Sequence, residues 1–323
     1  MFINWVHFCV PKISFLLAFL LNPLFVHLIR HENNVQLGSY RYLLFFFAFF
    51  NMLTALVDIL IPVCVHAYRS AFMTFLVGGP FFDSSFGAAA LSLRCGFIGG
   101  TYGILNVHFI FRYLLLRRSR LISQYFLPYG FISSVYFVSL HVIIWTLITY
   151  FVIHSSPELR QYIQESFKEE FAEDINHIYF CGGIFAETSD FVIYRSWAGI
   201  GLLTLLGSYS ITLYFVLGYK ILSGLNRGLT TMSHKTTQMQ KQLFKALTVQ
   251  TIIPVCVSFA PCTFAFYGAA LRLELVSWVY WAASIAVSMF PFLDPLAIIL
   301  CLPALRCRLR FAAHRATVSA VSN

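Results

Sequence analysis

Charge is scarce in this sequence: only 11% of its 323 residues are Asp, Glu, Lys or Arg. An ordinary soluble domain carries about 25% charged residues, so this chain has too few charges to cover a water-facing surface. The formal net charge of +9 would suit a nucleic-acid-binding protein, but the basic residues lie in loops, mostly on one side of long apolar stretches. We therefore expect a membrane protein that contacts the lipid bilayer and has no nucleic-acid partner.

Catalytic and cofactor motifs are also missing. The water-facing segments contain no nucleophile–base set and no phosphate-binding loop, and the eight cysteines are scattered without metal-ligand spacing. We predict no catalytic residue, no metal site and no cofactor, so an enzyme is the least favoured class. The hydrophobic N-terminus has no small-residue cleavage site, which indicates an uncleaved first span instead of a removed signal peptide.

Apolar residues, in contrast, are abundant. They make up 59% of the chain, Phe alone accounts for 35 residues, and the mean hydropathy is +0.76. A helical span needs roughly 20 apolar residues, and its backbone groups must be paired within the span. The sequence predicts an all-α membrane protein, a seven-helix bundle over residues 1–311 followed by a short cytoplasmic tail at 312–323. The predicted spans are residues 7–29, 42–66, 89–111, 129–153, 196–219, 246–270 and 276–300.

The distribution of Lys and Arg predicts the orientation. Of the 22 basic residues, 15 fall in segments on the side of the C-terminus, and the remaining seven, including Arg94, fall on the other side. Since cytoplasmic loops carry the excess of basic residues, the N-terminus is expected outside and the C-terminus in the cytoplasm.

The fourth and fifth spans are joined by a connection, about 154–195, that is too long for a plain turn. Ser156 followed by Pro157 is a helix-start signal, and apolar residues then recur every four positions opposite an acidic face. We predict an outer amphipathic helix over residues 157–178. It is either a lid over a ligand entrance or a packing element that stiffens the mouth of the bundle.

Basic segments flank the last two spans. The connection of about 220–245 is helical from Ser233 onward by pattern, and it is either a contact for a cytoplasmic partner or a positive-inside anchor. Residues 302–311 indicate a short basic helix on the inner leaflet, where Cys301 and Cys307 are palmitoylation candidates.

Two carboxylates, Asp58 and Asp294, lie inside predicted spans. Ionisable groups are costly in the membrane and are functional candidates by default. At 1.5 Å per residue, Asp58 lies about 25 Å from Arg41 and Asp294 about 18 Å from Arg306. The offset of roughly 7 Å favours indirect contact over a direct pair. Each carboxylate is alternatively a hydrogen-bond acceptor that stabilises a kink.

Several motifs in order resemble a known family. They are Leu37–Leu44 leading into the second span, His108–Tyr113 closing the third, Ser233–Thr236, Gln240–Leu247 and Gln250–Pro254 around the sixth, and Pro291–Pro295 in the seventh. Nearly end to end, the chain resembles a nematode serpentine chemoreceptor of the Str class, the seven-transmembrane odorant-receptor type.

The resemblance implies a G-protein-coupled chemosensory receptor in the plasma membrane of sensory-neuron cilia. A small odorant or other chemical cue would bind at the outer side, and a heterotrimeric G protein would bind at the cytoplasmic side. Arg112 would sit like the arginine of the rhodopsin-like Asp-Arg-Tyr motif, and Asp294-Pro295 like the Asn-Pro kink of the last span. This chain departs from those patterns at Phe111, which supplies no acid beside Arg112, and at Leu305, where the family usually has tyrosine.

The candidate site residues form three groups. The conformational-switch group is Asp58, Arg112, Asp294 and Pro295. The G-protein-facing group is Arg112, Tyr113, Arg117, Arg118, Lys235, Lys241 and Lys245. The ligand-binding group, chosen by depth in the outer halves of the spans, suits a small, weakly polar molecule and offers no strong charge to anchor an amine. It consists of Phe97, Thr101, Tyr102, Tyr267, Tyr280, Trp281 and Ser284.

Cys95 and Cys181 are candidates for an outer disulfide, because an extracellular face is oxidising. Cys95 precedes Arg112 by 17 residues, about 25 Å along a helix, and rhodopsin-like receptors have a longer spacing. A disulfide and two free thiols both remain open.

Two other functional classes remain as alternatives. A seven-span ligand-gated cation channel of the insect odorant-receptor kind has its N-terminus inside, opposite to the orientation that the charges predict. A small-molecule transporter would show inverted repeats around a midplane site, and the sequence shows no convincing repeat.

Overall fold

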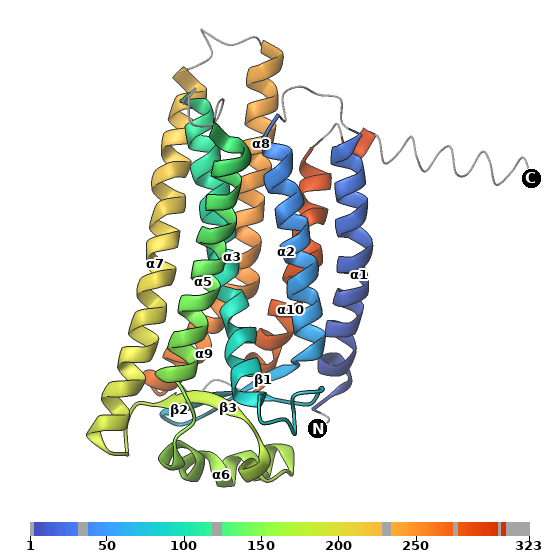
Figure 1. The fold of residues 1–323 in the computed structure, drawn as a ribbon. Helices are drawn as coiled ribbons and strands as arrows, with labels where there is room; N and C mark the ends of the chain where they lie inside the picture. The colour runs from blue at the N-terminus through green and yellow to red at the C-terminus, as the bar shows by residue number, and fades with distance from the viewer. Residues whose placement is uncertain are drawn as a thin grey trace, which may run out of the picture.

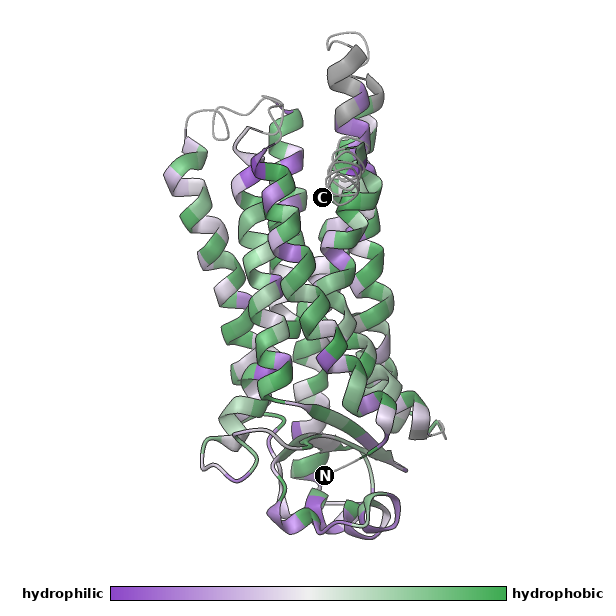
Figure 2. Cartoon of the chain, turned by 90° about the vertical axis from the view of Figure 1, so that its right-hand side faces the viewer, coloured by the Kyte–Doolittle hydropathy of each residue, from purple (hydrophilic) through white to green (hydrophobic). Residues whose placement is uncertain are grey.

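The computed structural model describes residues 3–31, 38–117, 125–227, 234–273, 277–302 and 305–307. Within these ranges, seven helical segments are long and apolar enough to cross a membrane. Hydrophobic residues cover most of the bundle and hydrophilic residues gather toward its two ends (Figure 2). The predicted seven-helix fold is confirmed. The helices that make the spans are α1 (Trp5–Arg30), α2 (Tyr40–Leu60), α3 (Gly87–Leu116), α5 (Phe131–Phe151), α7 (Asp190–Arg227), α8 (His234–Pro254), α9 (Ala260–Ala270) and α10 (Ser277–Cys301).

In the fourth span, the segment Phe126–Gly130 before α5 is kinked at Leu127, whose φ of −108° and ψ of 123° are not helical. The sixth span contains a π-helical turn, Val255–Phe259, which joins α8 to α9. Such single turns interrupt regular helices and are common at functional sites. Pro254 ends α8 and Pro261 stands in the first turn of α9, so the sixth span is irregular at mid-length.

The third span runs through the middle of the bundle and packs most closely against α5 (Figure 1). Small residues permit this approach: a Cβ atom on Gly99 would lie 2.8 Å from Cβ of Trp145 and 2.9 Å from the carbonyl oxygen of His141. A Cβ on Gly103 would lie 3.1 Å from the His141 side chain. Small residues at such spacing let membrane helices pack backbone against backbone.

Three short strands form a sheet across one end of the bundle, which we call the sheet end (Figure 1). β1 (Val63–Tyr68) pairs antiparallel with β2 (Ala71–Leu76), and β2 pairs antiparallel with β3 (Phe180–Ile184). The predicted second span extended to residue 66, and this boundary is wrong because α2 ends at Leu60. Pro62 disfavours helical geometry at the residue before it, and the chain continues as a strand.

A second layer, helix α6 (Pro157–Phe171), covers the sheet. Ser156 caps it through a 3.2 Å hydrogen bond to the Leu159 amide, and Ala172 ends it in the left-handed conformation at φ 57°. The predicted helix extended to residue 178, but only a 3₁₀ turn at Ile175–His177 continues it. The apolar face of α6, with Leu159, Ile163 and Phe167, packs on the sheet.

Candidate functional site

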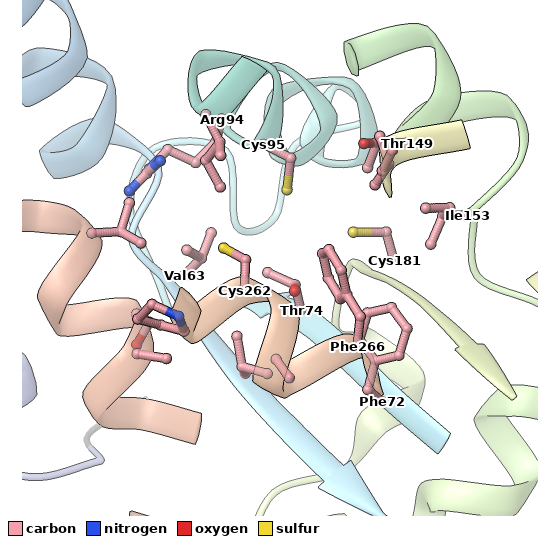
Figure 3. A pocket seen from close by; sticks show the side chains of 18 of the residues that line it. Val63, Phe72, Thr74, Arg94, Cys95, Thr149, Ile153, Cys181, Cys262 and Phe266 are labelled. Carbon is pink, nitrogen blue, oxygen red and sulfur yellow. The ribbon is translucent and has the colours of Figure 1, made fainter. Parts of the chain in front are cut away.

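A cavity lies on the side of the sheet that faces the helix bundle, between the strands and the helices (Figure 3). The cavity volume that water-sized molecules can reach is about 70 Å³, so a molecule bound here must be small. One side of the strands lines it, and every second residue faces inward. The lining residues are Val63, Val65, Phe72, Thr74, Arg94, Cys95, Ile98, Trp145, Thr149, Ile153, Cys181, Leu203, Pro261, Cys262, Ala265, Phe266, Ala283, Ser284 and Val287.

The cavity wall is mostly apolar. Hydroxyl groups of Thr74, Thr149 and Ser284 provide isolated polar points among aliphatic and aromatic side chains. This composition is typical of a pocket for a small organic molecule, where burial supplies affinity and a few polar groups fix orientation.

Three thiols project into this cavity, from Cys95 on α3, Cys181 on β3 and Cys262 on α9 (Figure 3). No disulfide links these three cysteines in the structure. The neighbouring Cys95 side chain, together with burial, raises the pKa of the Cys181 thiol. The structure thus places the two candidate disulfide partners at the same cavity.

Among the described residues that line the cavity, one is charged. Arg94 is 3% exposed and forms an ion pair with Asp58, which is itself 6% exposed. Arg94 was counted with the basic residues of the side opposite the C-terminus, and it lies near the sheet end of α3, inside the predicted span 89–111. The pair neutralises both charges, so the lining is close to electrically neutral at this point.

The residues predicted to bind ligand do not gather at one site. Ser284 lines the cavity, whereas Tyr102 and Tyr267 line an adjacent crevice between α7 and α9. Phe97 stacks on Phe50 instead, at 5.7 Å between ring centroids. Three others are placed as follows: Thr101 donates to the Ile98 carbonyl, Tyr280 is buried in α10, and the side chain of Trp281 lies outside the described residues.

The remaining lining residues were missed because helix rotation and the strands cannot be read from hydropathy. Val63, Val65, Phe72 and Thr74 come from segments that were not predicted as strands. Pro62 before residues 63–68 and the Arg69-Ser70 pair between the two strands were the available signals, but a short apolar stretch also suits a helix.

A buried polar cluster surrounds Asp294 in the middle of the bundle. Its carboxylate Oδ2 accepts from Asn51 Nδ2 at 3.5 Å and from Gln250 Nε2 at 3.4 Å. Asp58 has its own partner in Arg94, so the two carboxylates belong to separate groups. The side chains of Asn51 and Gln250 tie α2 and α8 to α10 at this level.

Asn22 completes this cluster from α1. Its Nδ2 donates to the backbone carbonyl of Pro291 at 3.0 Å and also to the carbonyl of Ala18. The carbonyl of Pro291 would pair in a regular helix with the amide four residues later, which is Pro295 and has no N–H. Asn22 therefore replaces the helical bond that Pro295 removes.

At the end opposite the sheet, Arg112 is 2% exposed and bonded to uncharged groups. Its Nη1 donates to Gln240 Oε1 on α8 at 2.9 Å, and its guanidinium lies over the Tyr40 ring at 4.0 Å. The Tyr40 hydroxyl is in turn 3.0 Å from His108 Nδ1. Gln240, Tyr40 and His108 are partners that the sequence did not indicate.

The other residues predicted to face a G protein lie near this same end. The Arg117 guanidinium lies 5.2 Å from the Tyr113 ring centroid, and Lys241 and Lys245 are exposed on α8. Arg118 and the side chain of Lys235 lie outside the described residues, as do residues 303–304 and 308–311 of the predicted tail helix.

Comparison with known proteins places this geometry in context. Residues 1–309 match the family model for the serpentine type seven-transmembrane GPCR chemoreceptor Srj. Serpentine receptor class J-38 of Caenorhabditis elegans is 34% identical over 311 residues, which cover 95% of this chain and 93% of that protein. Serpentine receptor class r-10 of Caenorhabditis briggsae is 24% identical over 298 residues, covering 89% of this chain and 84% of that protein.

A receptor with a Str-type name is also among the relatives. G-protein coupled receptor str-217 of Caenorhabditis elegans is 25% identical over 284 residues, covering 85% of this chain and 80% of that protein. The predicted resemblance to nematode serpentine chemoreceptors is confirmed, and the family model that matches is Srj.

Proposed function

Since this chain belongs to the Srj family of serpentine seven-transmembrane chemoreceptors, we propose that it is a G-protein-coupled receptor for a small, weakly polar chemical cue. The family consists of receptors, and the chain is a multi-pass membrane protein with a chemosensory role. The ligand would occupy the cavity beneath the sheet. The G protein would bind at the opposite end, around Arg112 and the exposed lysines of α8.

The observation that carries this proposal is the spacing of three features along one bundle. A small apolar cavity lies at the sheet end, the polar cluster of Asp294 lies between, and the buried Arg112 lies at the far end. Helices α3, α8 with its extension α9, and α10 contribute to more than one of these features. A change in helix packing at the cavity would therefore be transmitted to the opposite end through the same helices.

The orientation is part of the proposal, with the sheet end outside the cell and the C-terminus in the cytoplasm. Such a receptor would reside in the plasma membrane, and by family resemblance in the cilia of sensory neurons. The excess of Lys and Arg near the C-terminal side supports this orientation.

Antibody access to epitope tags tests the topology on intact and then permeabilised cells. We expect the N-terminal tag to be accessible on intact cells and the C-terminal tag only after permeabilisation. A G-protein reporter in the same cells then measures responses to a panel of volatile alcohols, ketones and esters. The reverse tag pattern would reject the receptor topology and favour the inverted cation channel.

A further inference from the structure

The sheet end of the cavity is covered by two layers. Cys181 and the inward-facing residues of β1 and β2 form the first layer, and α6 lies on the far side of the strands. His66 fastens the layers, with Nδ1 3.0 Å from Glu170 and Nε2 3.1 Å from Ser166. Phe167 is fully buried between them. A ligand arriving from water at this end would have to displace both layers.

A crevice adjoins the cavity on the side of the bundle. It lies between α7 and the segment formed by the π-helical turn and α9, with Tyr102 and Trp145 at its back. The volume of the crevice, measured in the same way as that of the cavity, is about 390 Å³. The crevice and the cavity are adjacent, because they share five of their described lining residues: Ile98, Trp145, Leu203, Cys262 and Phe266.

The crevice faces the lipid. Ser208 and Thr263 on its two sides are exposed, and Phe264 beside Thr263 is 57% exposed within an apolar span. Gly207 keeps the interior open, since a Cβ atom there would already lie 3.3 Å from the Tyr102 hydroxyl. A side chain at this position would narrow the crevice.

The chemistry of the crevice selects for uncharged molecules. Its described lining consists of apolar side chains and of hydroxyl groups from serine, threonine and tyrosine, without a charged group. Ions are strongly disfavoured in hydrocarbon, whereas a molecule with one hydroxyl or carbonyl group can exchange hydrogen bonds along such a wall. A hydrogen bond between two hydroxyl groups, Thr204 Oγ1 on α7 and Tyr267 Oη on α9, spans the crevice at 2.7 Å.

We propose that the ligand enters from the bilayer, through the crevice between α7 and α9, and that the Thr204–Tyr267 bond is the latch on this entrance. The ligand class is then an uncharged, membrane-partitioning molecule with a single hydroxyl or carbonyl group. This proposal rests on the proposed function for its physiological meaning, because it assigns a route to the same cavity.

Timed photolabelling tests the route. The full-length receptor is placed in lipid nanodiscs and mixed with an eight-carbon alcohol that carries an alkyl diazirine. A light pulse at defined times fixes the probe, and mass spectrometry measures adducts on Phe72, Thr74, Ala283 and Val287, which line the cavity and not the crevice. A matched eight-carbon sulfonate with the same diazirine reports entry from water.

Crevice variants and a matched control separate the outcomes. Ser208→Phe adds bulk at the mouth of the crevice and is expected to slow arrival of the alcohol at least fivefold. Gly201→Phe adds the same bulk on α7 where a Cβ meets nothing within 4 Å, and is expected to leave the rate unchanged. Thr204→Val and Tyr267→Phe remove the same bond from its two sides and are expected to speed arrival equally.

The results decide the proposal without a signalling assay. An unchanged rate in Ser208→Phe, or equal rates for sulfonate and alcohol in the natural chain, would overturn the bilayer route. If Ser208→Phe does not fold, unaltered arrival in both Thr204→Val and Tyr267→Phe would overturn the latch. If the labelling experiment contradicts the route but the G-protein reporter responds, the proposed function stands and the route does not. If the labelling supports the route but the reporter is silent, the route stands and the proposed function does not.

Discussion

Asn22 on α1 donates a 3.0 Å hydrogen bond to the carbonyl of Pro291 on α10, which has no helical partner because Pro295 lacks an N–H. The bond joins the first and seventh spans at the level of the Asp294 cluster. It is the kind of replacement that lets membrane helices contain proline, since the freed backbone group finds a side chain instead of lipid.

We expect Asn22→Leu to destabilise the receptor, because the Pro291 carbonyl would be left unpaired. An unsatisfied buried acceptor costs about 1–3 kcal/mol. Pro295→Ala restores the helical N–H, so the same Asn22→Leu change should have a smaller effect in that background. Thermal unfolding of the four proteins in detergent measures this coupling, and equal effects of Asn22→Leu in both backgrounds would contradict the assignment.

The Arg94–Asp58 pair should behave as a unit. Removing one partner leaves the other charge buried and unpaired, which costs about 3–5 kcal/mol. We expect Arg94→Gln and Asp58→Asn each to lower folding yield and melting temperature strongly, and the double variant to be more stable than the sum of the two losses predicts. Additive losses in a double-mutant cycle would show that the two side chains do not interact.

The bond between Arg112 and Gln240 ties α3 to α8 at the end proposed to meet the G protein. A hydrogen bond to a charged group is worth about 1.5–3 kcal/mol, so Gln240→Ala should raise basal reporter activity about tenfold or more if this bond restrains α8. Gln238→Ala, at an exposed position on the same helix, is the control. Unchanged basal activity at equal surface expression would mean that the bond does not restrain the active state.

Cys64 on β1 gives a pH prediction outside the spans. Burial raises the pKa of Cys64 to about 12, so the folded protein keeps this thiol protonated while an unfolded chain ionises it near pH 9. Its contribution to stability is complete below pH 9 and declines as the pH rises toward 12. A water-soluble maleimide should leave Cys64 unmodified at pH 8 until the receptor unfolds, as measured by mass spectrometry, and rapid labelling of the folded protein would exclude this burial.

The helices of this protein were predictable and the strands were not, for one physical reason. Long apolar runs between charged loops determine spans, but Val63–Ala67 prolongs the apolar run of the second span before Arg69 and Ser70 interrupt it. Pro62 marked a break, yet prolines also occur inside α1 and α10. Val63–Leu76 forms a hairpin of β1 and β2, and pairing with Phe180–Ile184, more than a hundred residues later, completes the sheet.

The candidate site was harder to predict than the fold, because it depends on which way each side chain points. Arg94 was counted with the loop charges, although Asp58 offered a partner at a similar depth. Gln240 stands in one of the motifs that carry the family resemblance, but the motif did not indicate that its amide would contact Arg112. Both Ser284 and Phe97 were chosen by their depth along a span. Ser284 lines the cavity, whereas Phe97 faces α2.

In the two strands between the cavity and α6, alternate residues face opposite sides of the sheet. Residues 63, 65, 72 and 74 line the cavity proposed to hold the ligand, while residues 64, 66, 71, 73 and 75 pack in the outer layer with α6. If the cavity binds the ligand as we propose, substitutions in the first set change the shape of the site and leave the residues that face α6 in place. Ligand selectivity would then diverge between receptors built on this plan while the covering layer keeps its stability.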